Sequence, residues 1–401
     1  MLSQLIKKQY ENSMRYMTVN EKIKEMMMTP MKEIHETIQF KNEKIECYRV
    51  QYNNILGPYK GGLRFNLCVD LDECRALSFW MMIKCALHKL PFGGGKGGIC
   101  IDPNLYSKEE LKQICELFVE KIHNHIGHNI DIPAPDVGST SEMMRWMNEK
   151  YMDIKQIKQL GNFTGKPVDY GGSKFREDAT GYGVYVCVRE WMLLNKMKYG
   201  TYIIQGFGNV GSYTAQYLND HLNLIAVGDH TGYYYNSEGF NIFELISLSR
   251  MYGSIKDLKH AKKITKEQFF SIKCDIIIPA ALEMQIDDKI AKNLNCKVVI
   301  EAANGPLTME ADEILESRKI QVIPDVLVNG GGVVVSYYEW LQNKINVRWN
   351  TKSIKQKLDL HMTEVFHYIM SHELYNKRIV AYMIAIRHVE SKYNENIKSK
   401  L

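Results

Sequence analysis

Three lysines stand at positions where an amino group could do chemistry. Lys60 lies in a glycine-rich turn, and Lys96 lies inside the run Phe92–Gly98, which is otherwise almost entirely glycine. Lys84 interrupts the apolar run Ala76–Leu87, where a buried ammonium group would require an anionic partner. Each lysine alone is more simply explained as a solvated or snorkelling side chain. Three of them in such surroundings favour a functional site.

Asp136 is the candidate acid/base. It lies in the segment Asp131–Gly138, which contains Pro133 and Pro135. Two prolines stiffen the backbone, and a stiff loop suits a carboxylate that must be positioned to transfer a proton. A lone aspartate in a loop is more commonly a turn former, and this alternative stays open.

A glycine-rich fingerprint indicates a dinucleotide site. Gly206, Gly208 and Gly211 have the G-x-G-x-x-G spacing, follow the predicted strand Thr201–Gln205 and open the predicted helix Asn209–Asp220. The first glycine makes the tight turn and the second lets the backbone approach a pyrophosphate. The third allows the helix and strand to pack closely. The positive end of the helix would face the phosphate charge.

Asp229 and its surroundings favour NAD over NADP. Asp229 lies just past the second predicted strand of this unit, where a carboxylate suits the adenosine ribose, although a plain turn aspartate is the alternative. No Lys or Arg occurs between Lys198 and Arg250, so a 2′-phosphate would meet no obvious cation. NADP stays possible if Lys262 or Lys263 reaches this loop.

The elements needed to position these residues predict an α/β fold. In the first part of the chain we expect a helix over 1–40, a strand over 45–52, a glycine-rich turn at 57–62, a helix over 71–90, a glycine-rich loop at 91–98 and a helix over 108–127. Further strands are expected at 201–205, 223–227, 274–278, 297–300 and 320–323, with helix from 351 onward. Strands that alternate with helices indicate parallel βαβ units.

The overall composition excludes several classes of protein. The net charge of +5 over 401 residues is too small and too dispersed for a nucleic-acid binder. Nine scattered cysteines without a C-x-x-C pair predict reduced thiols in a cytoplasmic protein and no structural zinc or other metal site. No apolar run approaches the ~20 residues of a membrane span, and no secretory signal is visible.

Several motifs occur in a characteristic order, and together they carry a family resemblance. They are Gly57–Arg64, Leu90–Pro103, Pro133–Asp136, Gly206–Gly211, Glu301–Pro306 and Pro324–Asn343. Over about residues 45–343 the chain resembles the hexameric glutamate dehydrogenases of bacteria and archaea, within the wider glutamate/leucine/phenylalanine/valine dehydrogenase family. Two departures are Gly330, where the family usually has alanine, and His230 after Asp229.

The resemblance implies a role for each matching residue. Lys96 would be the catalytic lysine and Asp136 the proton-transfer carboxylate. Lys84 would hold the substrate α-carboxylate, while Lys60 and Ser336 hold the side-chain carboxylate. The implied substrate-binding residues are in full Lys60, Lys84, Arg176, Val333 and Ser336. The implied cofactor-binding residues are Thr180, Gly206, Gly208, Asn209, Val210, Gly211, Asp229 and Asn304.

The same resemblance implies the domains and the reaction. Residues 1–172 would form an α/β substrate-binding and oligomerisation domain, joined by a C-terminal helix at about 375–401, and residues 173–374 a Rossmann-like NAD-binding domain. The reaction would be reversible oxidative deamination of L-glutamate to 2-oxoglutarate and ammonia, in a cytoplasmic homohexamer. A leucine, valine or phenylalanine dehydrogenase is one alternative, although those relatives generally have an apolar residue where Lys60 stands. A catalytically silent regulatory member is the other.

Overall fold

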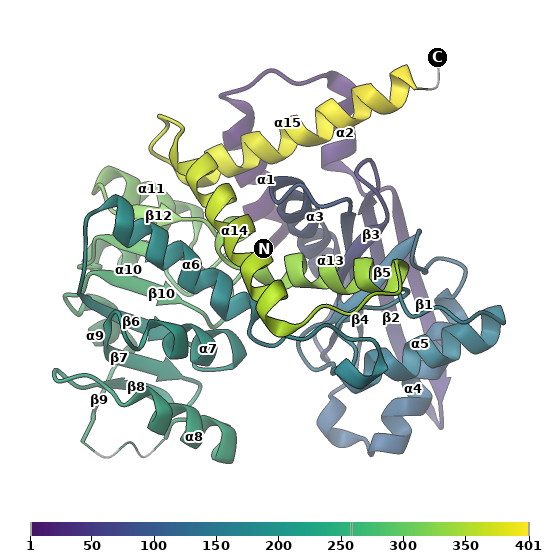
Figure 1. The fold of residues 1–401 in the computed structure, drawn as a ribbon, viewed down its shortest axis with the longest axis horizontal. Helices are drawn as coiled ribbons and strands as arrows, with labels where there is room; N and C mark the ends of the chain where they lie inside the picture. The colour runs from purple at the N-terminus through teal and green to yellow at the C-terminus, as the bar shows by residue number, and fades with distance from the viewer. Residues whose placement is uncertain (1, 257, 259, 400–401) are drawn as a thin grey trace. The chain divides into compact units, whose positions relative to one another are not determined.

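The computed structural model describes residues 2–256, 258 and 260–399, and it divides the chain into two units. The first unit comprises Met1–Arg176, Val333–Ile354 and Tyr382–Leu401, and the second comprises Glu177–Gly332 and Lys355–Ala381 (Figure 1). These bounds differ from the predicted domains, because 173–176 and 333–354 belong to the first unit and 375–381 to the second. The helix over 331–344, which begins the segment 333–354, buries polar side chains against loops of the first unit.

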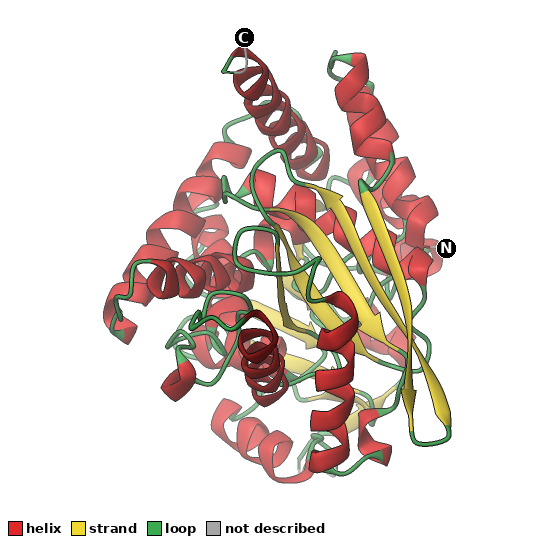
Figure 2. Cartoon of the chain, turned by 90° about the vertical axis from the view of Figure 1, so that its right-hand side faces the viewer, coloured by secondary structure: helices red, strands yellow, loops and turns green. Residues whose placement is uncertain are grey.

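The first unit is built on a mixed sheet with strand order β1-β2-β4-β3-β5. Its strands are β1 (Lys32–Phe40), β2 (Glu43–Asn53), β3 (Tyr59–Phe65), β4 (Gly93–Ile99) and β5 (Asp131–Pro135). The helices of this part are α1 (Leu2–Met14), α2 (Glu21–Met28), α3 (Leu71–Leu87), α4 (Lys108–Ile122), α5 (Ser141–Lys155) and α13 (Gly331–Lys344). β3 pairs in parallel with both β4 and β5, whereas β1, β2 and β4 pair antiparallel. Figure 2 shows the long strands of this sheet as yellow arrows.

Three sequence-based predictions for this unit are wrong. The helix expected over 1–40 ends before β1, whose alternating burial places Ile34 and Ile38 in the core. The glycine-rich segments expected as a turn and a loop are the strands β3 and β4. A Cβ atom on Gly61 would collide with the carbonyl oxygen of Gly95, so glycine is what allows these two strands to lie together.

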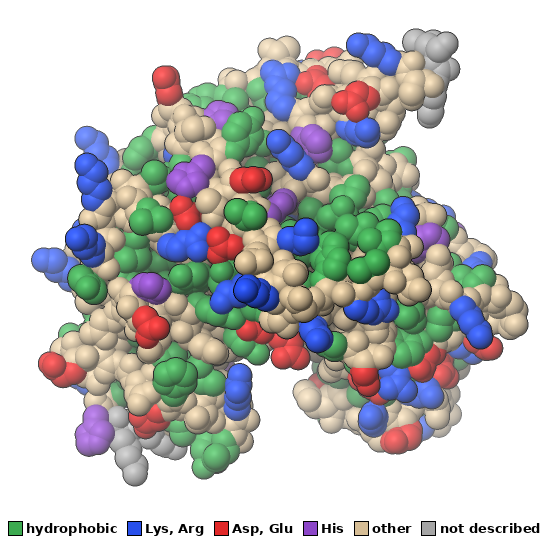
Figure 3. Space-filling view, in the orientation of Figure 1, with side chains coloured by type: hydrophobic (Ala, Val, Ile, Leu, Met, Phe, Trp, Pro, Cys, Tyr) green, Lys and Arg blue, Asp and Glu red, His purple; other side chains and the backbone are tan. Residues whose placement is uncertain are grey.

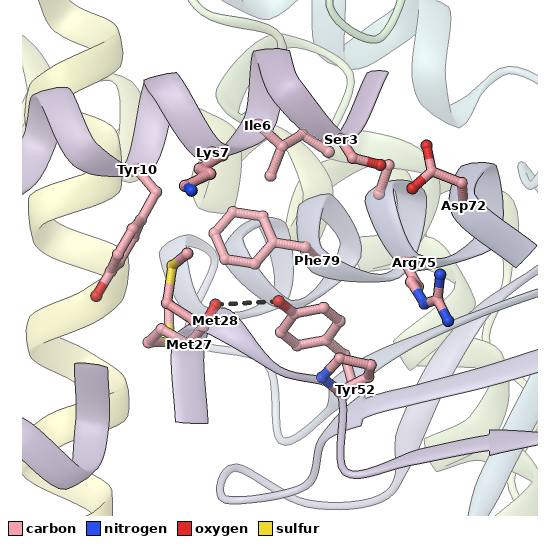
Figure 4. Close-up of a pocket in the computed structure, with 12 residues that line it drawn as sticks. Ser3, Ile6, Lys7, Tyr10, Met27, Met28, Tyr52, Asp72, Arg75 and Phe79 are labelled. Carbon is pink, nitrogen blue, oxygen red and sulfur yellow. Dashed lines mark hydrogen bonds between the residues drawn. The ribbon is translucent and has the colours of Figure 1, made fainter. Parts of the chain in front are cut away.

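The N-terminal helices border a hollow of the first unit (Figure 4). Phe79 of α3 lies across it, and the Tyr52 hydroxyl donates a hydrogen bond to the Met27 carbonyl at 3.0 Å. Deeper in the core, the Trp80 indole N–H donates to the hydroxyl of Tyr382 at 2.9 Å. This bond fastens α15 (Lys377–Lys398) to α3.

The second unit confirms the predicted Rossmann-like sheet. Its strand order is β12-β11-β10-β6-β7-β8-β9, parallel from β12 to β7 and antiparallel beyond it. The strands are β6 (Thr201–Gln205), β7 (Asn223–Asp229), β8 (Gly232–Tyr235), β9 (Lys262–Ile264), β10 (Ile276–Pro279), β11 (Val298–Ile300) and β12 (Gln321–Ile323). The remaining helices are α6 (Ala179–Leu194), α7 (Asn209–Leu218), α8 (Ile242–Tyr252), α9 (Lys266–Ser271), α10 (Asp288–Asn293), α11 (Met309–Ser317), α12 (Asp325–Val328) and α14 (Thr351–Met370).

Two surface properties accompany this fold. None of the helices in the described part of the chain combines the length and the hydropathy needed to cross a lipid bilayer. On the face drawn in Figure 3, Lys and Arg side chains are interspersed with acidic and apolar ones rather than gathered into one continuous area.

Candidate active site

A lysine–aspartate pair links strand β4 of the first-unit sheet to the residue that follows β5. Lys96 projects from β4 and its ammonium group contacts the Asp136 carboxylate, which immediately follows β5. Gly62 of the intervening strand β3 leaves room for this pair, because a Cβ atom there would collide with the Asp136 carboxylate. The sheet therefore brings together the two residues predicted to be catalytic.

The surroundings of Asp136 keep its carboxylate ionised. One oxygen accepts hydrogen bonds from the Arg64 Nε at 3.1 Å and from the Val137 N–H at 2.8 Å. Burial raises the pKa of Asp136, but the charges of Lys96 and Arg64 outweigh burial and lower this pKa to about 2. At neutral pH the carboxylate is thus ionised and held in one orientation.

Lys60 of β3 is a buried cation among other cations. Its side chain is 1% exposed, and burial, followed by the charges of Arg176 and Arg49, lowers its pKa to about 7. In the described part of the chain, Glu339 is the carboxylate that acts on Lys60, and Glu339 is itself bound to Lys166 at 2.7 Å. An anionic ligand would stabilise the charged form of a lysine buried in these surroundings.

The Arg176 guanidinium group has a buried hydrogen-bond donor that lacks an acceptor in the described part of the chain. Its Nε atom is buried and has no hydrogen-bond partner among the described residues. Burial lowers the pKa of Arg176, although the Glu339 carboxylate opposes this shift. A buried donor without an acceptor is costly, and a substrate carboxylate would satisfy it.

Helix α13 supplies the remaining predicted substrate residues. Ser336 is buried and its hydroxyl donates to the Thr164 hydroxyl at 3.0 Å, while Val333 lies in the first turn. One turn further, the Glu339 carboxylate accepts hydrogen bonds from the Gly165 N–H at 2.8 Å and from Lys166. Glu339 thereby fixes the loop that carries Thr164 against the helix that carries Ser336.

Lys84 lies on the helix that covers this sheet. It is 7% exposed in α3, and its charge and that of Lys60 both lower the pKa of the Cys85 thiol, which burial raises to about 12. Gly94 of β4 would collide with the backbone and side chain of α3 if it carried a Cβ atom. The strand thus lies directly against the helix, on which Lys84 and Cys85 are neighbours.

The sequence-based assignment omitted a buried ion pair beneath the site. Arg49 of β2 donates from Nε to Asp131 at 2.9 Å and from Nη1 to the Gly62 carbonyl at 3.0 Å. Both side chains are fully buried, and the bond from Arg49 to the Gly62 carbonyl holds the backbone of β3 in place. The two residues are 82 positions apart, and neither stood out by type or spacing. Arg64 and Glu339 were overlooked for the same reason.

The glycine fingerprint of the second unit has the expected geometry. Gly206 turns the chain with φ +96°, and a Cβ atom on Gly211 would collide with the carbonyl oxygen of Gly206. Gly208 differs, because a Cβ atom there would meet nothing within 4 Å. Gly208 begins α7 without a side-chain cap, so its helix N-terminus is open to an anion. Val210 lies in the same first turn.

Asp229 ends β7 and is engaged within its own loop. Its two oxygens accept hydrogen bonds from the Thr231 N–H and the Ile255 N–H, both at 2.7 Å. Lys263 of β9 reaches the same loop and donates from Nζ to the Thr231 carbonyl at 3.2 Å. The cation that the sequence alone could not place is therefore beside the residue proposed to read the ribose.

The loop that carries Asn304 is held by a buried charge cluster. The Asn304 side-chain oxygen accepts from Asn329 at 3.0 Å, and the Gly305 N–H donates to Asp325 at 2.8 Å. Arg378 donates to Glu301 at 2.7 Å and binds Asp325 as well, and it also binds Asp312 at 3.0 Å. These residues set the position of the loop that follows β11.

Two further predicted residues lie near the start of helices. Thr180 is in the first turn of α6, and the Asn209 amide donates to the Glu177 carbonyl at 2.9 Å. All predicted substrate residues thus lie in the first unit and all predicted cofactor residues in the second. Within the described residues, no cluster of three or more His, Cys, Asp or Glu side chains is arranged to hold a metal ion.

The chain was compared with known families and proteins. Residues 171–396 match the glutamate/leucine/phenylalanine/valine dehydrogenase model, and residues 30–153 match the dimerisation domain of the same family. A glutamate dehydrogenase of Thermotoga maritima is 44% identical over 85% of this chain and 84% of its own length. The NAD-specific glutamate dehydrogenase of Clostridioides difficile is 38% identical over 96% of both chains, and a NADP-specific one of Halobacterium salinarum is 34% identical over 97% and 96%.

A solved structure gives the same result at the level of the fold. The hetero-hexameric glutamate dehydrogenase of Thermus thermophilus in its Leu-bound form is 26% identical, with a TM-score of 0.94. The match covers 98% of this chain and 97% of that one. Sequence motifs, geometry and relatives agree, and the chain belongs to the glutamate/leucine/phenylalanine/valine dehydrogenase family.

Proposed function

We propose that this chain catalyses the reversible oxidative deamination of L-glutamate to 2-oxoglutarate and ammonia. The observation that carries the proposal is Lys60, a buried ammonium group with a lowered pKa on the strand beside the Lys96–Asp136 pair. Glutamate is a dicarboxylate, so its side-chain carboxylate would neutralise Lys60. The relatives named as glutamate dehydrogenases support the same substrate.

In this proposal, different residues of the first unit bind the two carboxylates of the substrate. Lys84 binds the α-carboxylate, Lys60 and Ser336 bind the far carboxylate, and Val333 lines that end. Arg176 supports the far end through its unpaired Nε. A lysine suits each carboxylate because it acts as a compact point charge.

Lys96 and Asp136 perform the proton transfers. After loss of hydride from the α-carbon, the substrate is an iminium that water must attack. Lys96 first releases a proton to Asp136 and can then take one from that water, and Asp136 relays protons to and from the nitrogen. Their direct contact provides the path.

The second unit fits a nicotinamide dinucleotide. The uncapped start of α7 and the open space at Gly208 suit the pyrophosphate, held by Gly206, Gly208, Val210 and Gly211. Asp229 binds the adenosine ribose, and Thr180, Asn209 and Asn304 lie at the nicotinamide end. When bound, the cofactor accepts the hydride. NAD is the proposed cofactor on the carboxylate of Asp229, and NADP is possible because Lys263 lies beside that loop.

Assembly and location complete the proposal. The first unit is proposed to bind substrate and to form the contacts of a homohexamer, and the second to bind NAD. The family dimerisation domain over 30–153 and the hetero-hexameric relative support assembly. A cytoplasmic location is proposed from the nine cysteines, all of which are free thiols.

The test is a steady-state assay of reduced-nicotinamide formation from L-glutamate, L-leucine, L-valine and L-phenylalanine, each with NAD and with NADP. The proposal expects the highest kcat/KM for glutamate with NAD. A preference for an apolar amino acid would assign the chain to the other branch of the family. No turnover with any pair would indicate the silent regulatory alternative.

A further inference from the structure

A second pocket of the first unit lies apart from the predicted substrate residues. It has a volume of about 440 Å³ and lies beside the C-terminal end of α13, against segment 158–161. Its basic lining residues are His128, Lys158, Lys344 and Arg348, and none of its lining residues is acidic. We call it the α13 pocket. Its size is that of a small-molecule site.

The basic side chains of the α13 pocket are not neutralised within the chain. In the described part of the molecule, Lys158, Lys344 and Arg348 form no ion pair with a carboxylate. Lys344 lies 4.6 Å from the centroid of the Trp340 ring, a cation–π contact that leaves its positive charge in place. Several cations around one concavity attract anions strongly.

The wall of the α13 pocket is ordered by hydrogen bonds. The Trp340 indole N–H donates to the His128 carbonyl at 2.9 Å, and Gln159 contacts the His128 ring at 3.2 Å. Burial lowers the pKa of His128, and the charge of Lys344 lowers it further. The Asn343 side-chain oxygen is buried and accepts no hydrogen bond from the described residues. This oxygen is therefore part of the packed wall behind the pocket.

We propose that the α13 pocket binds a ligand carrying several phosphate groups, whether free pyrophosphate or the polyphosphate chain of a nucleotide. Its volume exceeds what one small oxyanion would fill, and its separate basic side chains suit several charged oxygens.

Binding there is coupled to the substrate residues, a part of the inference that rests on the proposed function. Asn343 donates to the Gly171 carbonyl at 3.0 Å, and Gln342 donates to the Ser173 hydroxyl at 3.3 Å. The segment 171–176 leads directly to Arg176, and Ser336 lies on the same helix as Asn343. A ligand that shifts this end of α13 therefore acts on two residues proposed to bind the far carboxylate of the substrate.

The binding test is isothermal titration calorimetry with inorganic pyrophosphate at constant ionic strength, on the full chain without substrate. The wild type should bind, and Lys158→Gln/Lys344→Gln should lose roughly tenfold or more in affinity, because it removes two charge-assisted contacts. Lys121→Gln is the matched control, an exposed lysine on α4 outside the pocket. Equal affinity in the double variant and the wild type, or no binding by the wild type at millimolar pyrophosphate, would overturn the inference.

Two further arms sharpen the result. Thermal melts check that the double variant is folded, and Lys158→Glu, which reverses one exposed charge, should weaken binding more than Lys158→Gln. ATP is titrated in saturating NADH, so that it cannot report the cofactor site. Tighter binding of ATP than of pyrophosphate identifies a nucleotide, and the reverse order identifies free phosphate.

Pyrophosphate should change the KM for glutamate in the wild type only. An unchanged KM with intact binding would refute the coupling.

Discussion

Lys60 combines a functional charge with an unfavourable environment. Its pKa in the folded chain is about 7, below the ordinary value of 10.5, so the unfolded chain holds this proton more tightly. Between pH 7 and pH 10.5 the free energy of unfolding therefore rises with pH, because the folded chain releases this proton first. Below about pH 7 the full cost of burying the charged lysine is present. Lys60→Leu should therefore raise the free energy of unfolding at pH 7 by on the order of 1 kcal/mol. Chemical denaturation without substrate measures it. A less stable variant would contradict the assigned burial cost.

The same substitution tests substrate choice. Lys60→Leu leaves the far carboxylate of glutamate without its cation, a loss of roughly 1.5–3 kcal/mol. The kcat/KM for glutamate should fall at least ~10-fold, while that for norvaline rises relative to it. Residual turnover should persist because Lys84 and Lys96 are untouched. If the ratio of the two kcat/KM values stays constant, Lys60 does not set specificity.

Lys96 should be needed for chemistry and not for cofactor binding. Lys96→Ala removes the amine that contacts Asp136, and turnover should fall by ~10²-fold or more. NAD binding should be unchanged, since the predicted cofactor residues lie in the other unit. Steady-state kinetics and fluorescence titration with NADH separate these two effects. Near-normal turnover at neutral pH would remove Lys96 from the mechanism.

At the scale of elements, alanine substitutions at two glycines of the fingerprint should affect different properties of the protein. Gly208→Ala meets no protein atom within 4 Å, so the melting temperature should stay constant while NAD affinity falls, because the methyl group intrudes on the pyrophosphate. Gly211→Ala collides with the Gly206 carbonyl and should lower the melting temperature. Thermal melts and NADH titration on both variants check this pair. Unchanged NAD affinity in Gly208→Ala would place the pyrophosphate elsewhere.

The elements also show which features the sequence could predict. The parallel strands of the second unit were recoverable because buried parallel strands are short, continuous apolar runs, as in Ile276–Pro279. The short antiparallel strands β8 and β9 were not predicted. β4 was mistaken for a loop because its Gly-Gly-Gly-Lys-Gly-Gly run lacks the side chains on which strand patterns depend. Its glycines are required by neighbouring backbone, which only the folded structure supplies. Long-range pairs such as Arg49–Asp131 leave no local pattern at all.

The catalytic candidates were predictable for a different reason. Lys96 and Asp136 stand in unusual local sequences and match a family motif, and the structure brings them into contact. Their supports could not be predicted, because Arg64 and Glu339 act through contacts with residues distant in sequence.

At the scale of the molecule, the cluster around Arg378 ties stability to pH. Burial raises the pKa of Glu301 to about 7, despite Arg378, which lowers it. Its folded-state pKa exceeds the ordinary 4.5, so the stabilisation is fully present below 4.5 and is lost as pH rises to about 7. Glu301→Gln should remove that part of the pH dependence. Denaturant titrations of both proteins from pH 4.5 to 7 test it, and parallel curves would contradict the raised pKa.

Neither unit is a continuous stretch of chain, and this affects the order in which the units can fold during protein synthesis. The second unit includes Arg378, so a nascent chain that ends earlier exposes Glu301, Asp312 and Asp325 without their common cation. The first unit includes Tyr382, whose hydroxyl bonds Trp80 and Gln9. Domains generally fold from the N-terminus as they leave the ribosome. Here the segment from Tyr382 onward completes the unit that began first, so both cores close only after Arg378 and Tyr382 have been synthesised.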